Sequence, residues 1–169
     1  MKFGRSKQVE QGIQIGVCIT SEGISIACVD STTQASGLPR FKVCQFVAAP
    51  KKDHSKILSN LVKTYNLEGL PTVCILSVSQ YDLFLIEEPE VTPEELIAAV
   101  RWKVKDYVEY PINEAAIDYM PLPTKALDVK GKMGYAVVAK QSNVDEMVQL
   151  MSSVGLQVIA VDISETAVT

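Results

Sequence analysis

The 169-residue sequence has one histidine, His54, and four cysteines, none of them in a CxxC pair. Zinc sites built from several histidines are therefore excluded. A Ser-His-Asp triad would depend on His54 alone, which stands in a polar stretch beside two lysines. Each cysteine lies in an apolar or β-branched run, as small buried residues do, so we expect a reduced, cytosolic protein.

The sequence also lacks an excess of positive charge and any long apolar run. It carries 16 Lys and Arg against 20 Asp and Glu, a formal charge of −4, so nucleic acid is not the expected partner. No run approaches the roughly 18 apolar residues of a spanning helix. The cations before residue 11 are followed by an interrupted apolar stretch, which is a poor signal-peptide core. We expect the segment to act in solution, or at a membrane surface through a partner.

Hydrophobic residues are plentiful, at 47%, which is enough to bury a core. In the first half, β-branched and apolar runs predict four strands and one helix in the order βββαβ. Residues 72–78 are almost continuously apolar, as in a parallel strand buried on both faces. The predicted strands are 13–19, 24–29, 41–48 (after a turn at 37–39) and 72–78, and the helix is 53–63.

In the second half, Thr92 and Glu95 form a capping-box pattern with Pro93 between them, which predicts that a helix begins there. Apolar residues at helical spacing extend this helix to Val108, before Pro111. The remaining pattern predicts strands at 81–86, 115–122, 133–139 and 156–161, and a helix at 143–154.

This order allows two arrangements. Residues 81–161 read alone as βαββαβ, which is the pattern of a ferredoxin-like domain. Alternatively, strand 156–161 returns to pair with strand 72–78, and the elements between them form an insertion into an α/β core. Periodicity does not decide between these two arrangements, whereas the pairing of the last strand does.

The stretch EELIAAVRWKVKDYVEYPINEAAIDYMPLP at residues 94–123, followed by residues 134–168, resembles the PilM family of type IV pilus assembly proteins. The matching details are Arg101 and Trp102 in a helix, the stop at Tyr110 and Pro111, the strand end at Asp118 and Tyr119, and residues 155–162. The resemblance covers about residues 78–167.

The resemblance implies an α/β, actin-like (RNase H-like) core subdomain with a mixed sheet, and an inserted βαββα subdomain of the 1C type. The expected division is 11–78 plus 156–169 for the core and 79–155 for the insertion. The resemblance also implies that a second actin-like half follows, with a helix beginning near Thr169.

In ATP-binding actin-like proteins the first hairpin is a phosphate loop with an aspartate and turn glycines. Here Cys18 stands at the aspartate position and Thr20 at a glycine position, and only Gly16 and Gly23 remain glycine. Without the carboxylate, the anchor for magnesium is lost, so we expect no cofactor in this segment. ATP binding by a longer protein stays open. Paired carboxylates at helix starts are explained by the helix dipole, so no catalytic residue is predicted.

Trp102 lies about 200° from Val100 on a helical wheel, so it points away from the apolar face of its helix. Two interpretations remain open, packing against a neighbouring subdomain or anchoring a partner. For a partner, the binding residues would be Trp102 with Arg101, Lys103 and Lys105.

The predicted function is a non-catalytic cytoplasmic scaffold of a type IV pilus assembly platform at the inner-membrane face. The resemblance implies recruitment by the N-terminal segment of a bitopic, PilN-like membrane protein. The alternatives are an actin-like ATPase whose nucleotide site is completed by a second half, and a ferredoxin-like binding module. Nucleotide binding separates the first two, and the pairing of strand 156–161 separates the third.

Overall fold

The computed structural model describes residues 12–30, 40–123 and 131–166. Its first sheet contains β1 (Ile13–Ile19), β2 (Gly23–Asp30), β3 (Arg40–Ala48), β4 (Pro71–Leu76) and β8 (Gln157–Ile163). The second contains β5 (Tyr81–Glu87), β6 (Ala115–Pro121) and β7 (Met133–Lys140). The helices are α1 (His54–Thr64), α2 (Leu96–Val104) and α3 (Gln141–Ser153). The predicted turn at 37–39, residue 11 and residues 167–169 lie outside the described residues.

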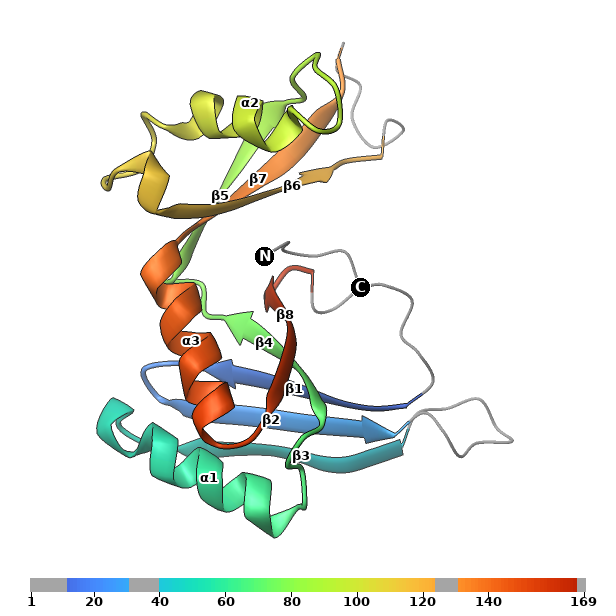
Figure 1. Ribbon diagram of the computed structural model, residues 1–169, viewed down its shortest axis with the longest axis vertical. Helices are drawn as coiled ribbons and strands as arrows, with labels where there is room; N and C mark the ends of the chain where they lie inside the picture. The colour runs from blue at the N-terminus through green and yellow to red at the C-terminus, as the bar shows by residue number, and fades with distance from the viewer. Residues whose placement is uncertain (1–11, 31–39, 124–130, 167–169) are drawn as a thin grey trace.

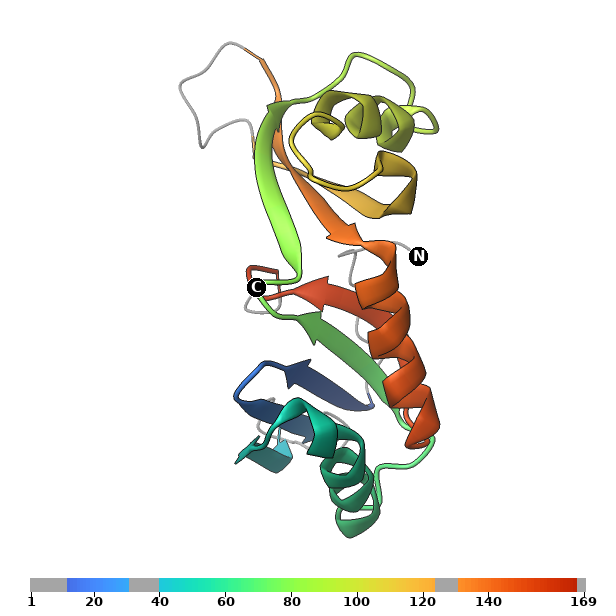
Figure 2. The ribbon, with the colours of Figure 1, turned by 90° about the vertical axis from the view of Figure 1, so that its left-hand side faces the viewer.

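The two sheets form separate lobes (Figures 1 and 2). The five-stranded sheet has the order β3-β2-β1-β4-β8, and the three-stranded sheet has the order β5-β7-β6. We call the three-stranded sheet with α2 the small lobe. Its elements lie between β4 and β8 in the sequence, and α3 leads back from β7 to the five-stranded sheet (Figure 1). That the small lobe is a 1C-type subdomain stays a prediction.

The pairing of the last strand decides between the two arrangements that the sequence allows. β8 lies parallel to β4, with Thr72 opposite Val158 and Cys74 opposite Val161. β4 is also parallel to β1, whereas β1 and β2 form an antiparallel hairpin, so the sheet is mixed. The predicted pairing of 156–161 with 72–78 is confirmed. The ferredoxin-like arrangement is wrong, because it would place β8 beside β5, whereas β8 pairs with β4 in the other sheet.

Helix α3 packs on the five-stranded sheet and also contacts β6 and β7 of the small sheet. Its buried residues Val144, Met147 and Met151 belong to the same core as Leu58 of α1 and Cys74 of β4. Both α1 and α3 therefore cover one face of the five-stranded sheet (Figures 1 and 2). The division of the chain into 11–78 plus 156–169 and 79–155 stays a prediction. Helical spacing reveals an apolar face but not which sheet covers it.

Helix α2 is shorter than predicted, because it spans Leu96–Val104 and not 92–108. The Glu95 carboxylate accepts hydrogen bonds from the Thr92 N–H at 3.4 Å and the Thr92 hydroxyl at 3.1 Å. The Thr92 hydroxyl thus bonds to a side chain and does not cap the backbone of the helix. The hydroxyl-to-backbone half of the capping box is therefore missing. At the other end, α2 stops before Tyr107, whose ring packs on Phe84 with ring centroids 5.5 Å apart.

A second core lies between α2 and the small sheet. Val100 and Val104 are fully buried and pack on Ile117, Ala136 and Val138. The opposite face of the small sheet joins the core of the five-stranded sheet through Tyr81, Val137 and Ala139. The Tyr81 hydroxyl also donates a hydrogen bond to the Glu165 carboxylate, 2.5 Å away and just beyond β8. In the part of the chain that the structure describes, no helix is long and apolar enough to cross a bilayer.

Candidate functional site

The β1–β2 hairpin, where a phosphate loop would lie, closes on its own hydrogen bonds. The Thr20 N–H donates to the Gly23 carbonyl at 2.9 Å, and the Thr20 hydroxyl accepts the Glu22 N–H at 3.2 Å. The Glu22 carbonyl accepts the Ala49 N–H at 3.0 Å, which ties the turn to the end of β3. These polar groups are engaged within the protein.

The two remaining hairpin glycines have different environments. A Cβ added to Gly23 would lie 2.2 Å from the Val47 carbonyl oxygen, because β3 approaches closely there. A Cβ on Gly16 would meet no atom within 4 Å. Packing against β3 therefore accounts for Gly23, without any phosphate.

Cys18, at the aspartate position of a phosphate loop, is half-buried in β1, and burial raises the pKa of its thiol. A neutral thiol does not hold the waters of a magnesium ion as a carboxylate does. Within residues 12–30, 40–123 and 131–166, no cluster of three or more His, Cys, Asp or Glu side chains is arranged to hold a metal ion. The absence of a cofactor stays a prediction.

The predicted partner-binding residues lie together at the end of α2, but they are not equally available. Trp102 is 69% exposed, and the Lys105 ammonium stands 4.4 Å from its ring centre. Arg101 instead donates to the carbonyls of Ile112 at 2.5 Å and Ala115 at 3.2 Å. Arg101 therefore anchors the segment that leads into β6, a contact between residues 11 and 14 positions apart that helical spacing does not reveal.

Lys103 also has an internal partner, since its ammonium donates to the Glu87 carbonyl at 2.8 Å. Of the four predicted binding residues, Trp102 and Lys105 therefore remain available, with the 64% exposed Tyr107 nearby in sequence. Helix α2 lies on the side of the small sheet away from the five-stranded sheet (Figure 1). Residues of α2 therefore do not line the space between the two lobes.

The face of the small sheet opposite α2 carries residues that sequence reasoning missed. Leu85 of β5 lies opposite Tyr135 of β7, which lies opposite Met120 of β6. Leu85 is 49% exposed, and Tyr135 and Met120 are half-buried. The signal was present in β5, where Leu83 and Leu85 alternate with Phe84 and Ile86, because a strand that is apolar on both faces needs a cover on both.

Comparisons with known proteins find likeness in structure only. No family model matches the sequence, and no curated protein matches it. Among solved structures, this chain is similar to a "PilM-PilN type IV pilus biogenesis complex", with a TM-score of 0.74 and 18% identity. The match covers 92% of this chain and 48% of the chain in that structure. The cytoplasmic domain of EpsL, an inner membrane component of the Vibrio cholerae type II secretion system, matches 90% of this chain and 57% of its own, with a TM-score of 0.64 and 14% identity.

A third solved structure, described as having an actin-like ATPase fold and unknown function, comes from Bacteroides thetaiotaomicron. It matches 98% of this chain and 57% of its own, with a TM-score of 0.52 and 7% identity. The chain has an actin-like fold. It spans about half the length of the solved chains that it matches, from 48% to 57%. Identities this low establish the fold alone, because one fold hosts many functions.

Proposed function

We propose that this protein is a non-catalytic cytoplasmic scaffold of a type IV pilus assembly platform, at the inner-membrane face. The observation that carries the proposal is the likeness of 92% of the chain to the PilM–PilN complex at a TM-score of 0.74. The likeness to the EpsL cytoplasmic domain supports a role beside an inner-membrane component. The expected partner is a PilN-like bitopic membrane protein.

Within type IV pili, we propose a mannose-sensitive haemagglutinin (MSHA) system. The support is the resemblance of residues 78–167 to MshI, the PilM-like protein of that pilus. The match lies in the α2 helix with Arg101 and Trp102, the stop at Tyr110 and Pro111, and the segment 155–162 around β8.

The non-catalytic part of the proposal rests on the hairpin, where Cys18 replaces a carboxylate and Thr20 bonds within its own turn. A ligand at about 100 times its dissociation constant would stabilise the fold by roughly 2.7 kcal/mol, a shift of a few degrees in Tm. We expect no such shift for this chain in millimolar Mg-ATP. A saturable rise in Tm that unrelated anions do not reproduce would instead support the ATPase alternative.

We propose that the N-terminal cytoplasmic segment of the partner binds on the face of the small sheet opposite α2. Leu85, Tyr135 and Met120 form an apolar row on this face, and Leu85 is 49% exposed. An extended peptide there would gain affinity from apolar side chains placed against this row. The Trp102 surface on α2 is the alternative place for the same segment.

Titration calorimetry of the chain with N-terminal peptides of PilN-like proteins tests the recruitment and its position. We expect saturable binding that Leu85→Asp weakens at least about tenfold, since a carboxylate would be desolvated against an apolar ligand. Trp102→Ala is the matched control on the other face and should leave the affinity unchanged. Absence of heat for every such peptide, with folded protein, would contradict recruitment. Loss of binding in Trp102→Ala alone would move the site to α2.

A further inference from the structure

Strand β3 forms an outer edge of the five-stranded sheet. It stands last in the strand order, so among the described residues it pairs with β2 alone. It lies at the end of the molecule away from the small lobe (Figures 1 and 2). This edge is therefore separate from the peptide site proposed on the small sheet and does not depend on it.

The hydrogen bonds beside the β1–β2 turn determine which backbone groups of β3 face outward. The Ala49 N–H donates to the Glu22 carbonyl at 3.0 Å, so the backbone of residue 49 faces β2. Backbone groups alternate in direction along an antiparallel strand. The N–H and C=O groups of residues 45 and 47 therefore also face β2, whereas those of Cys44, Phe46 and Ala48 point away from the sheet. Such a row of outward groups is a template for one further strand.

Two exposed aromatic rings accompany this open edge. Phe46 lies opposite Ser25, and Phe41 lies opposite Val29, and both β2 residues alternate with residues of the core. The rings therefore lie on the face of the sheet away from α1 and α3. Phe41 is 59% exposed and Phe46 is 53% exposed. Apolar side chains of an added strand would cover these rings and gain free energy by burial.

The half of β3 that carries the outward groups lacks the usual protection of an edge. Natural edge strands are protected by charged residues, proline or a bulge. In β3 the register shift and the charged residues Arg40 and Lys42 lie in the first half of the strand. Residues 43–48 contain no charged residue and no proline. This half of the edge is therefore suited to accept a strand.

The charge around the edge indicates the chemistry of that strand. Residues 40–67 contain six Lys and Arg but one acidic residue, in a chain with a formal charge of −4. Arg40 begins β3, and Lys51 and Lys52 follow its end. The ion pair of Lys51 with Glu146 is loose, since these exposed side chains are 3.9 Å apart. Cations at both ends of the edge favour a strand with acidic ends.

A second copy of this chain fits the same edge less well. Antiparallel pairing about Phe46 is the register that uses all the outward groups of both copies. It would place Arg40 opposite Lys52 of the second copy. Like charges directly opposite each other destabilise a strand pair, so the charges favour a different polypeptide.

We propose that β3 binds an extended, acidic segment of a partner polypeptide as an added antiparallel strand. Main-chain hydrogen bonds to Cys44, Phe46 and Ala48 supply affinity, as in other cases of strand addition. Apolar side chains against Phe46 and carboxylates near Arg40 and Lys52 supply specificity.

The test uses the ¹⁵N-labelled chain and a probe peptide with blocked termini, which has alternating valine and threonine residues and two glutamates at each end. In the free chain we expect the N–H groups of residues 44, 46 and 48 to exchange with solvent faster than those of 45 and 47. Saturating probe should slow exchange at 44, 46 and 48 by at least about tenfold. Two control peptides should not bind: the same probe N-methylated on the residues that face β3, and a version with lysine in place of glutamate.

Three variants make the assignment specific. Phe46→Thr keeps a strand-forming residue and should weaken the probe by about tenfold. Ile159→Thr is the matched control, because Ile159 is 51% exposed on β8, the other outer strand of the sheet, and it should leave the affinity unchanged. Arg40→Gln should weaken the probe by about threefold, and it keeps the test decisive if Phe46→Thr does not fold.

Three results would overturn the proposal. The first is equal binding of the N-methylated or the lysine peptide. The second is the absence of saturable binding by the glutamate probe. The third is slow exchange at residues 44, 46 and 48 in the free chain that increases with protein concentration, because a second copy would then occupy the edge.

Discussion

Gly23→Ala is expected to lower the free energy of unfolding by about 3 kcal/mol, which is a large effect for one methyl group. The new Cβ would lie 2.2 Å from the Val47 carbonyl oxygen and 2.9 Å from the Ala48 Cα. Both are backbone atoms of β3, which cannot withdraw without breaking the pairing of Gly23 with Ala48. Urea denaturation followed by circular dichroism measures the change.

Gly16→Ala in the neighbouring strand is the matched control for Gly23→Ala. Its Cβ meets nothing within 4 Å, and alanine restricts the unfolded chain more than glycine does. We therefore expect no loss, or a gain of about 0.5 kcal/mol. Equal losses at both glycines would contradict the packing explanation.

Arg101→Met is expected to lower the free energy of unfolding by about 2 kcal/mol, because it removes two charge-assisted hydrogen bonds from a half-buried position. The carbonyls of Ile112 and Ala115 would lose the donor that holds the segment before β6. Methionine keeps most of the length and the apolar part of the side chain. Thermal and urea unfolding of the variant measure the loss.

Trp102→Ala, the adjacent change, should cost less than about 1 kcal/mol. Trp102 is 69% exposed, and its contact in the free protein is the cation of Lys105. If Trp102→Ala lowers the free energy of unfolding more than Arg101→Met does, then the tryptophan, and not the arginine, supports the fold. The two variants thus separate stability from the predicted partner surface.

The strands could be predicted well from the sequence, because their signals are local. Residues 13–19 form β1 as predicted, and the predicted strand 81–86 differs from β5 by one residue. Apolar and β-branched runs that end at Gly, Pro or polar residues are sufficient for this. The predicted start of α2 at residue 92 was wrong. The Thr92–Glu95 pattern fits a capping box, but it also fits the observed hydrogen bond between the Thr92 hydroxyl and the Glu95 carboxylate.

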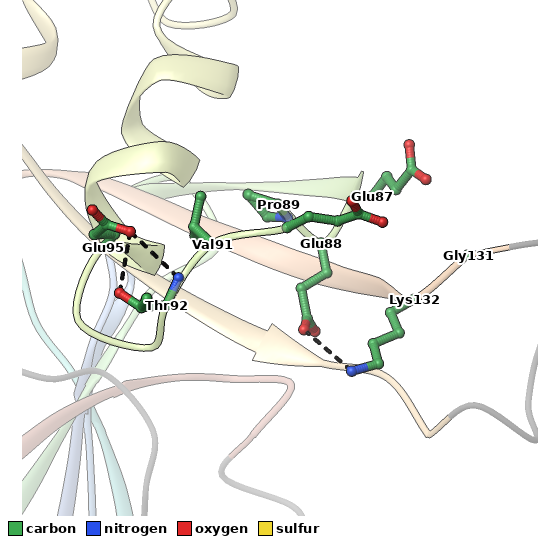
Figure 3. A pocket seen from close by; sticks show the side chains of 9 residues that line it. Glu87, Glu88, Pro89, Val91, Thr92, Glu95, Gly131 and Lys132 are labelled. Atoms are coloured by element: carbon green, nitrogen blue, oxygen red, sulfur yellow. Dashed lines mark hydrogen bonds and ion pairs between the residues drawn. The ribbon is translucent and has the colours of Figure 1, made fainter.

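Less of the candidate sites could be predicted. The exposure of Trp102 follows from helical spacing, whereas the partners of Arg101 and Lys103 lie 11 to 16 residues away in the sequence. The pocket at the end of the small sheet (Figure 3) is lined by residues 87–92 and Glu95 together with Gly131 and Lys132. Tyr119 reaches Glu88 across the small sheet. Spacing along one element carries no information about such contacts.

The sequence by itself determined the order of the elements, the weakness of the phosphate-loop pattern and the apolar faces of the helices. Only the tertiary structure decided that β8 pairs with β4, that α3 packs on the five-stranded sheet, and that α2 lies on the side of the small sheet away from it. Periodicity records which residues of an element avoid water. Which partner covers them depends on burying the apolar faces of all elements at once, and that is a property of the whole fold.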